Sequence, residues 1–233
     1  MPIASLDYEG AKLNMHADSP IEAQWRVHAC HKEPWTLAFI ESIPAPAVFW
    51  DIGANTGPYS LIAASRGLFP VCVEPGFANF HNLCSNLAIN NFLDKSIQLQ
   101  LALGEVEKYE WFHYRDLRAG AASHILGGAR KLTHHKQLIR LRTWDALFAE
   151  LPLSPTVAQF AKIDADGGEL SILKGATQTL ARLSGLMVEL SNEQEAETVA
   201  LLAAAGLLLA ERFDKRDGKP LGAIAYGRFA REV

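Results

Sequence analysis

Two acidic residues of this chain, Asp51 and Glu74, each stand directly after a short apolar segment. Between them lies a turn with two spaced glycines, Gly53 and Gly57. An apolar segment that ends in an acid and enters a glycine turn is typical of a buried parallel strand that connects tightly to a helix. Glycine allows the backbone of such a turn to approach a ligand closely and to adopt conformations that other residues disfavour.

The turn favours a particular kind of ligand. The residues after it, from Tyr59 and Ser60 onward, have helical spacing, so the turn leads into a helix N-terminus, where negative groups are stabilised. A dinucleotide would place its diphosphate there, next to Asp51, and a cofactor with a cationic amine suits that acid better. Ala54 and Asn55 also interrupt the Gly-x-Gly-x-x-Gly spacing of dinucleotide sites. We therefore interpret the turn as a binding loop for S-adenosylmethionine (SAM).

The second acid, Glu74, is placed to bind a ribose. In a doubly wound sheet the second strand lies beside the first, and the acid at its end reaches the ribose of the cofactor. Its separation from Asp51 is close to the roughly 20 residues expected for a strand, a helix and a strand. This spacing serves NAD as well as SAM, and each acid taken alone could be a solvated residue at a strand end. The two acids together, with the glycines between them, favour a cofactor site.

Four sequence blocks are informative together: Lys-Glu-Pro-Trp-Thr at 32–36, Asp-Ile-Gly-Ala-Asn-Thr-Gly-Pro-Tyr-Ser at 51–60, Asn-Leu-Ala-Ile-Asn at 86–90, and the segment 162–176, which begins Lys-Ile-Asp and ends Leu-Lys-Gly-Ala. With these blocks the chain resembles the FkbM family of SAM-dependent methyltransferases over roughly residues 26–190. The glycine turn occurs in many methyltransferases, whereas the last block is more specific. Asp166 stands where the family usually has Glu, and Gly168 where it has a bulkier residue, so contacts with the methyl acceptor are not carried over.

The resemblance implies an α/β class I methyltransferase (Rossmann-like) fold, with a seven-stranded, mostly parallel sheet, an antiparallel last strand and helices on both faces. It also implies O-methylation of a hydroxyl on a sugar or a polyketide-like natural product. Asp51 would meet the methionine end of SAM, Glu74 the ribose, and Ala102 and Leu103 the adenine. The full predicted cofactor site is Asp51, Gly53, Ala54, Asn55, Gly57, Tyr59, Ser60, Glu74, Pro75, Ala102, Leu103 and Asp164.

Strands and helices are expected to alternate along the chain, as in a parallel sheet covered on both faces. Residues 1–42 form an N-terminal extension, with a hairpin over 5–16 that turns at Gly10 and helices over 20–42, the second opened by Pro34. Residues 43–233 form the SAM-binding domain. Its strands are predicted near 47–51, 70–74, 96–102, 159–164, 185–190, 207–213 and 222–229, and its helices near 58–66, 77–90, 143–150, 168–182 and 193–205.

The ends of the fourth and fifth strands carry the candidate catalytic residues, Asp164 and Glu189. Adjacent parallel strands lie about 4.8 Å apart, so we expect these two acids to be neighbours. One could accept the proton of an acceptor hydroxyl as a general base, with its proton affinity raised by the charge of the other. Both could instead bind a divalent cation with Asn192, a reading that we do not favour, or Asp164 could only shape the cofactor pocket. Lys162 is expected to pair with Glu169 or Glu189.

The segment 104–143 interrupts the alternation and is predicted to determine acceptor specificity. The sequence 107–114 alternates polar and apolar residues, as a half-exposed strand does, and 120–128 is small and glycine-rich, which suits a loop that closes over a ligand. A basic run follows: Arg130, Lys131, His134, His135, Lys136, Arg140 and Arg142. We favour an exposed strand pair over an anion site there, and because consecutive residues of a strand face opposite ways, the two histidines are not predicted to bind metal.

Composition limits the remaining possibilities. The 233 residues are 49% hydrophobic and 21% charged, as in an ordinary globular enzyme, and the net charge of −4 does not favour nucleic-acid binding. No apolar segment approaches the roughly 20 residues of a membrane helix, and the three cysteines have no metal-ligand spacing, so we expect a cytoplasmic protein with a small-molecule acceptor and no membrane partner. A nicotinamide-dependent oxidoreductase and a non-catalytic SAM-binding protein remain alternatives, and the oligomeric state stays open.

Overall fold

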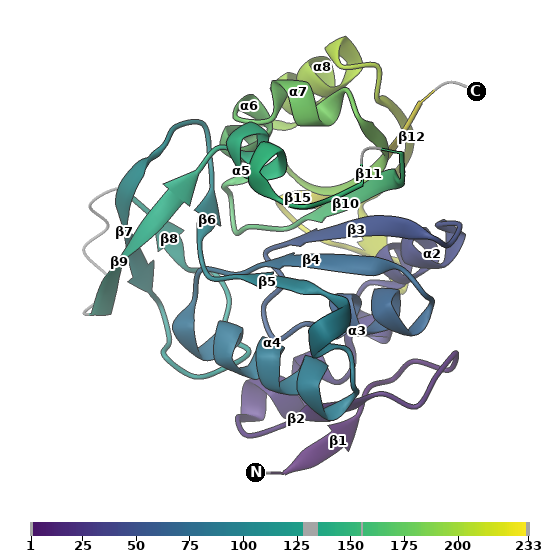
Figure 1. Cartoon of the computed structure of the whole chain (residues 1–233), viewed down its shortest axis with the longest axis vertical. Helices are drawn as coiled ribbons and strands as arrows, with labels where there is room; N and C mark the ends of the chain where they lie inside the picture. The colour runs from purple at the N-terminus through teal and green to yellow at the C-terminus, as the bar shows by residue number, and fades with distance from the viewer. Residues whose placement is uncertain (1, 128–134, 155, 232–233) are drawn as a thin grey trace.

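The computed structural model describes residues 2–127, 135–154 and 156–231. A seven-stranded sheet with the order β12-β15-β11-β10-β3-β4-β5 forms its centre (Figure 1). The five strands from β11 to β5 are parallel, whereas β15 pairs antiparallel with both β11 and β12. The strands are β3 (Ala47–Ile52), β4 (Phe69–Val73), β5 (Ile97–Leu99), β10 (Ala158–Ile163), β11 (Leu183–Ser191), β12 (Leu208–Phe213) and β15 (Ile224–Ala230). The predicted sheet with its antiparallel last strand is confirmed.

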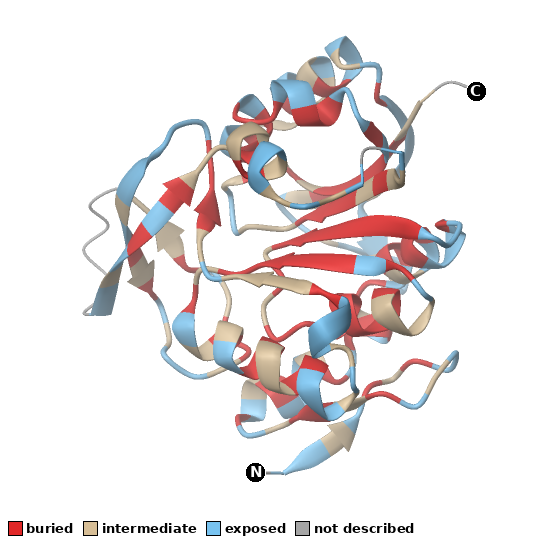
Figure 2. Ribbon diagram, in the orientation of Figure 1, coloured by how far each residue is buried: buried red, intermediate tan, exposed pale blue. Residues whose placement is uncertain are grey.

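Both faces of the sheet are covered by helices, because its central strands are apolar on both sides. All six residues of β3 are buried, and they alternate between two cores: Phe49 packs with one helical layer, and Trp50 and Ile52 with the other (Figure 2). The first layer contains α2 (Pro34–Ser42), α3 (Pro58–Ser65) and α4 (Phe77–Ile89). The second contains α5 (Trp144–Glu150), α6 (Glu169–Lys174), α7 (Thr177–Leu180) and α8 (Glu195–Ala204).

Two predicted elements are wrong in their extent. The strand expected over 96–102 ends at Leu99, and Ala102 and Leu103 pair with a different sheet. The helix expected over 168–182 is divided into α6 and α7 at Gly175. A Cβ at Gly175 would lie 2.1 Å from the carbonyl oxygen of Gly104, so this close approach of two segments requires glycine and interrupts the helix.

A second sheet, of order β6-β9-β7-β8, is built from the segment that interrupts the alternation (Figure 1). Its strands are β6 (Ala102–Leu103), β7 (Lys108–Tyr114), β8 (Ile125–Leu126) and β9 (His135–Arg142). The antiparallel pair of β7 and β9 agrees with the predicted exposed strand pair, and Lys136 and Arg140 lie exposed on it. Gly128, Arg130, Lys131 and His134 of the loop and the basic run lie outside the described residues.

The N-terminal extension packs against α4 and the turn before α3. The predicted hairpin is formed by β1 (Ile3–Ser5) and β2 (Asn14–His16), and the helical stretch is divided into η1 (Glu22–Arg26), α1 (Ala29–Lys32) and α2, which begins at Pro34 as predicted. Asn86 of α4 accepts the N–H of His16 (2.8 Å) and donates to the carbonyl of Thr56 (2.8 Å). This gives the 86–90 block a structural role, as a clamp between the extension and the glycine turn.

The described residues also include three short elements: η2 (Leu93–Lys95) and the hairpin strands β13 (Lys215–Arg216) and β14 (Lys219–Pro220). Within the described ranges, no helix combines the length and the apolar character needed to cross a membrane.

Candidate active site

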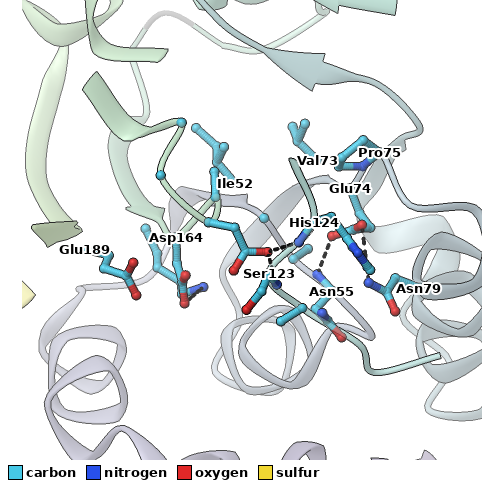
Figure 3. Close-up of a pocket in the computed structure, with 18 of the residues that line it drawn as sticks. Ile52, Asn55, Val73, Glu74, Pro75, Asn79, Ser123, His124, Asp164 and Glu189 are labelled. Atoms are coloured by element: carbon cyan, nitrogen blue, oxygen red, sulfur yellow. Dashed lines mark hydrogen bonds and ion pairs between the residues drawn. The ribbon is translucent and has the colours of Figure 1, made fainter. Parts of the chain in front are cut away.

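A cavity of about 610 Å³ lies along the carboxyl ends of β3, β4, β10 and β11 (Figure 3). Open parallel sheets bind ligands at this edge, where connections leave neighbouring strands toward opposite faces. The volume is within the range of small-molecule sites. The predicted cofactor residues that line the cavity are Gly53, Ala54, Asn55, Tyr59, Glu74, Pro75, Ala102, Leu103 and Asp164, and Glu189 lines it as well.

Glu74 is an almost fully buried carboxylate in the cavity wall. It accepts the backbone N–H of Asn55 (2.9 Å) and of Gly76 (2.7 Å), and the amide of Asn79 lies 3.5 Å away. Burial raises its pKa to about 7, although these hydrogen bonds act in the opposite direction. A carboxylate has about four acceptor positions and these three donors occupy three of them, so Glu74 can accept two further donors where one of them replaces the long contact with Asn79.

The glycine turn packs tightly against its surroundings. Gly53 has a φ of +79°, and a Cβ there would lie 1.8 Å from the carbonyl oxygen of Asp164. Gly57 has a φ of +85°, and a Cβ there would lie 2.5 Å from a methyl of Leu83. Both positions therefore require glycine, Gly53 to lie against the end of β10 and Gly57 to lie against α4.

Asp51, Gly57 and Ser60 are not brought to the cavity surface. The Asp51 side chain is completely buried on the α3 side of the sheet, where it accepts a hydrogen bond from the Ser60 hydroxyl (2.6 Å). Side chains of a strand alternate between its faces, and Asp51 points under the turn rather than past the strand end. The structure thus corrects the expected direct contact of these three residues with a ligand.

Lys162 is the buried partner of Asp51, which the sequence did not predict. Its ammonium lies 3.9 Å from Asp51 and 3.4 Å from Asp164, so the expected pairing with Glu169 or Glu189 is wrong. Burial alone would lower the pKa of Lys162, but the carboxylates of Asp164, Asp51 and Glu33 together raise it above its ordinary value. Lys162 is therefore a permanent cation beneath the cavity.

Asp164 and Glu189 are neighbours, as predicted, and Glu169 joins them: carboxylate oxygens of the three lie within 4.8 Å of one another. Burial would raise the pKa of Asp164, but nearby cations, Lys162 foremost, hold it below its usual range. Burial and the charges of Asp164 and Glu169 instead raise the pKa of Glu189 to about 8, against a hydrogen bond that it accepts from the Tyr226 hydroxyl (3.1 Å). The two acids therefore differ in protonation at neutral pH.

The three acids do not require a metal ion to coexist. The ammonium of Lys162 already offsets the charge of Asp164. One oxygen of Glu169 accepts the N–H groups of Ala165 (2.7 Å) and Gly167 (3.3 Å). We therefore do not assign these residues as metal ligands.

The described part of the predicted closing loop lies along the cavity and is held by three side chains, of which the sequence analysis did not single out Asn79. The carbonyl of Ala121 accepts the side-chain amides of Asn55 (2.8 Å) and Asn79 (3.0 Å). Asp166 accepts the N–H groups of Ser123 (2.7 Å) and His124 (3.3 Å). The sequence marked Asp166 as a departure from the family pattern but did not predict its contact with this loop.

Comparison with known proteins identifies the family. The family model described as the methyltransferase FkbM domain matches residues 51–212. The chain belongs to the FkbM methyltransferase family. Members of this family use SAM as the cofactor and transfer its methyl group. The alternative of a nicotinamide-dependent oxidoreductase, which the position of Glu74 alone left open, is therefore not supported. A comparison with curated protein sequences gives no match.

Solved structures show the same fold at low sequence identity. Precorrin-6y C5,15-methyltransferase from Geobacter metallireducens GS-15 has a TM-score of 0.52 and 12% identity, with 94% of each chain covered. The C-terminal domain of precorrin-6Y C5,15-methyltransferase from Rhodobacter capsulatus has a TM-score of 0.50 and 15% identity, covering 86% of this chain and 88% of that one. The predicted class I methyltransferase fold is confirmed.

Proposed function

We propose that this FkbM methyltransferase transfers the methyl group of SAM to a hydroxyl oxygen of a small molecule, a sugar or another natural product, with Glu189 as the proton acceptor. The observation that carries the proposal is that Glu189 and Asp164 are neighbours in the wall of one cavity, where burial and the charge of Asp164 raise the pKa of Glu189 to about 8. A general base works best when its pKa lies near the operating pH. When bound, SAM supplies a methyl group that its sulfonium already activates.

The two catalytic candidates, Glu189 and Asp164, would have different roles. Glu189 would take the hydroxyl proton as the methyl group passes from sulfur to oxygen and leaves S-adenosylhomocysteine, and the negative charge of Asp164 would stabilise the protonated Glu189. Asp164 is itself a poor base, because Lys162 holds it in the ionised form. Tyr226, which lies opposite Glu189 in the antiparallel register of β11 and β15, orients the Glu189 carboxylate through its hydroxyl.

The cofactor is proposed to lie between the turn and Glu74. The Glu74 carboxylate would accept hydrogen bonds from both ribose hydroxyls, and the apolar Ala102 and Leu103 would line the adenine. The size of the cavity and the acid in its wall fit a nucleoside of this kind. Asp51 would act indirectly, because it holds the ammonium of Lys162 beneath the site. No divalent cation takes part in this scheme.

The acceptor is proposed to bind at the Glu189 end. Aromatic and apolar side chains line this end beside polar groups: Trp35, Leu221, Ile224 and Tyr226. These residues come from the N-terminal extension and from the chain around and after the β13–β14 hairpin. We therefore extend the acceptor-specificity region beyond the expected 104–143 to include both. A concave site of this size suits a small molecule rather than a polymer.

Product analysis tests the proposal. The purified protein is incubated with SAM carrying a labelled methyl group and with a panel of sugars and hydroxylated natural products, each paired with its deoxy analogue. We expect label in the hydroxylated member of a pair only, located on oxygen by mass spectrometry. Label on nitrogen or carbon would contradict O-methylation. Retention of S-adenosylhomocysteine (SAH) without transfer to any member would favour the non-catalytic alternative.

A further inference from the structure

The loop of residues 119–124, which we call the covering loop, is tied to several parts of the cavity wall. The Ser19 hydroxyl donates to the carbonyl of Ala119 (2.6 Å), and the guanidinium of Arg26 donates twice to the carbonyl of Gly120 (2.9 and 2.7 Å). Asn79 accepts the N–H of Gly120 (2.8 Å) and, like Asn55, donates to Ala121, while Asp166 accepts the last two N–H groups. Hydrogen bonds to the extension, the glycine turn, α4 and the end of β10 thus hold the loop across the site.

Asn55 and Asn79 bind both the covering loop and Glu74. The backbone N–H of Asn55 and the side chain of Asn79 approach the carboxylate that is proposed to hold the ribose. The same two residues donate their side-chain amides to the loop. The position of the loop is therefore coupled directly to the proposed nucleoside site.

His124 ends the covering loop in a fixed orientation. It is 7% exposed and lies edge-on to Phe112 (5.4 Å between ring centres) and Tyr114 (5.3 Å). Its Nδ1 accepts the backbone N–H of Arg115 (3.2 Å), which places the ring proton on Nε2. Burial lowers the pKa of His124 to about 4, so the ring is neutral at physiological pH. Among the described residues Nε2 has no acceptor within hydrogen-bonding distance.

His124 also lines the nucleoside end of the cavity. Phe112, against which it packs, belongs to the same small core as Ala102, the predicted adenine contact. In the view of Figure 3, His124 and Asn55 stand between Asp164 on one side and Glu74 on the other. The cavity is therefore lined both by His124, a neutral N–H donor on the loop, and by Glu74, a carboxylate acceptor directly after β4.

We propose that His124 is a cofactor-binding residue, whose Nε2–H donates to a nitrogen or oxygen of the SAM nucleoside when the covering loop is closed. The inference rests on the proposed cofactor site and adds to it a donor that no sequence motif indicated. Asp166 is then a positioning residue, because its carboxylate holds the two N–H groups at the end of the loop that carry His124 into place. This role of Asp166 in holding the loop is distinct from a contact with the methyl acceptor.

Two substitutions at His124 separate the donor from the ring. In His124→Asn the side-chain oxygen can replace Nδ1 as the acceptor for Arg115, but nothing replaces Nε2–H. In His124→Gln the longer side chain can place an amide N–H near the Nε2 position. His81→Asn is the matched control, because His81 is exposed on α4 and does not line the cavity.

Isothermal titration with SAH measures the effect without an acceptor. We expect His124→Asn to raise the Kd roughly threefold to tenfold, as for the loss of one hydrogen bond, and His124→Gln and His81→Asn to stay within about twofold of wild type. An unchanged Kd for His124→Asn would overturn the proposal, and so would equal weakening by Asn and Gln, because the ring rather than the donor would then matter. Absence of SAH binding by the wild type would refute the cofactor site itself and is distinguishable on that ground.

Hydrogen exchange of the covering loop provides a second readout that does not depend on the His124 variants. We expect SAH to slow exchange of the N–H groups of Ser123 and His124 in the wild type, and Asp166→Asn to speed it in the free protein and to raise the Kd for SAH. If SAH does not change the exchange rates of these N–H groups in the wild type, the proposed coupling of the loop to the nucleoside is overturned.

Discussion

Replacement of Glu74 by glutamine provides the most direct test of the cofactor site. A hydrogen bond to a charged group contributes about 1.5–3 kcal/mol, and glutamine keeps one of the two acceptor oxygens of Glu74. The loss of one charged acceptor then corresponds to a Kd for SAH that is roughly tenfold to a hundredfold higher. The variant preserves the size of the side chain, so packing in the wall is retained.

The pH dependence of SAH binding adds a signature specific to Glu74. Its pKa is raised to about 7, so about a tenth of it is ionised at pH 6 and most of it at pH 8. Only the ionised form can accept hydrogen bonds from both ribose hydroxyls while it keeps its two backbone N–H bonds. The Kd of the wild type should therefore fall roughly tenfold from pH 6 to pH 8 and then level, whereas Glu74→Gln should lose this change.

Calorimetric titration of SAH at pH 6, 7, 8 and 9 measures both effects without a known acceptor. Glu9→Gln serves as the matched control, because Glu9 is exposed in the N-terminal extension. A wild-type Kd that does not change with pH, together with equal affinity of Glu74→Gln, would refute the assignment of Glu74 to the ribose.

Four further predictions follow from the same geometry. In Glu189→Gln, kcat should fall roughly 10²- to 10⁴-fold, with little change in the Kd for SAH. In the wild type, kcat/KM measured from initial rates should rise tenfold per pH unit below about pH 8, and the variant should lose this rise. Folding raises the pKa of Glu74, so the folded protein favours its protonated form. As the pH rises from about 4.5 to 7, the wild type should therefore lose up to roughly 3 kcal/mol of unfolding free energy relative to Glu74→Gln, measured by urea unfolding. The opposite trend would contradict a protonated, buried Glu74. Lys162→Met should leave the carboxylate of Asp51 buried and unpaired, and should lower the free energy of unfolding by about 3–5 kcal/mol; a neutral effect would mean that Asp51 is not charged. Gly53→Ala should lower the melting temperature and weaken SAH binding, because its Cβ would lie 1.8 Å from a backbone oxygen, and wild-type behaviour of this variant would contradict the turn geometry.

The order of the elements and the location of the site could be predicted from the sequence, because both depend on local patterns. Apolar segments that end in acids mark parallel strands, and the carboxyl ends of such strands share one edge of the sheet. This is sufficient to place Glu74, Asp164 and Glu189 in a common cavity. The glycines of the turn could be predicted for the same reason, because a positive φ is a local requirement.

The sequence alone did not determine how polar side chains pair across the fold. Asp51 and Lys162 are partners because the register of the parallel strands β3 and β10 places them side by side. Their side chains share one face of the sheet, and that face is set by the register and by the alternation of side chains along each strand. Tyr226 reaches Glu189 only through the antiparallel register of the last strand. No local pattern encodes either alignment.

The chain by itself therefore determined the fold class, the family and the edge of the sheet that carries the chemistry, since these follow from the periodicity of apolar residues and from contiguous motifs. Only the tertiary structure decided which acid is protonated, which cation lies beneath the site, and that Asp166 accepts hydrogen bonds from the loop. The physical reason is that burial and charge–charge distances set these properties, and both arise from contacts between segments that are far apart in the sequence.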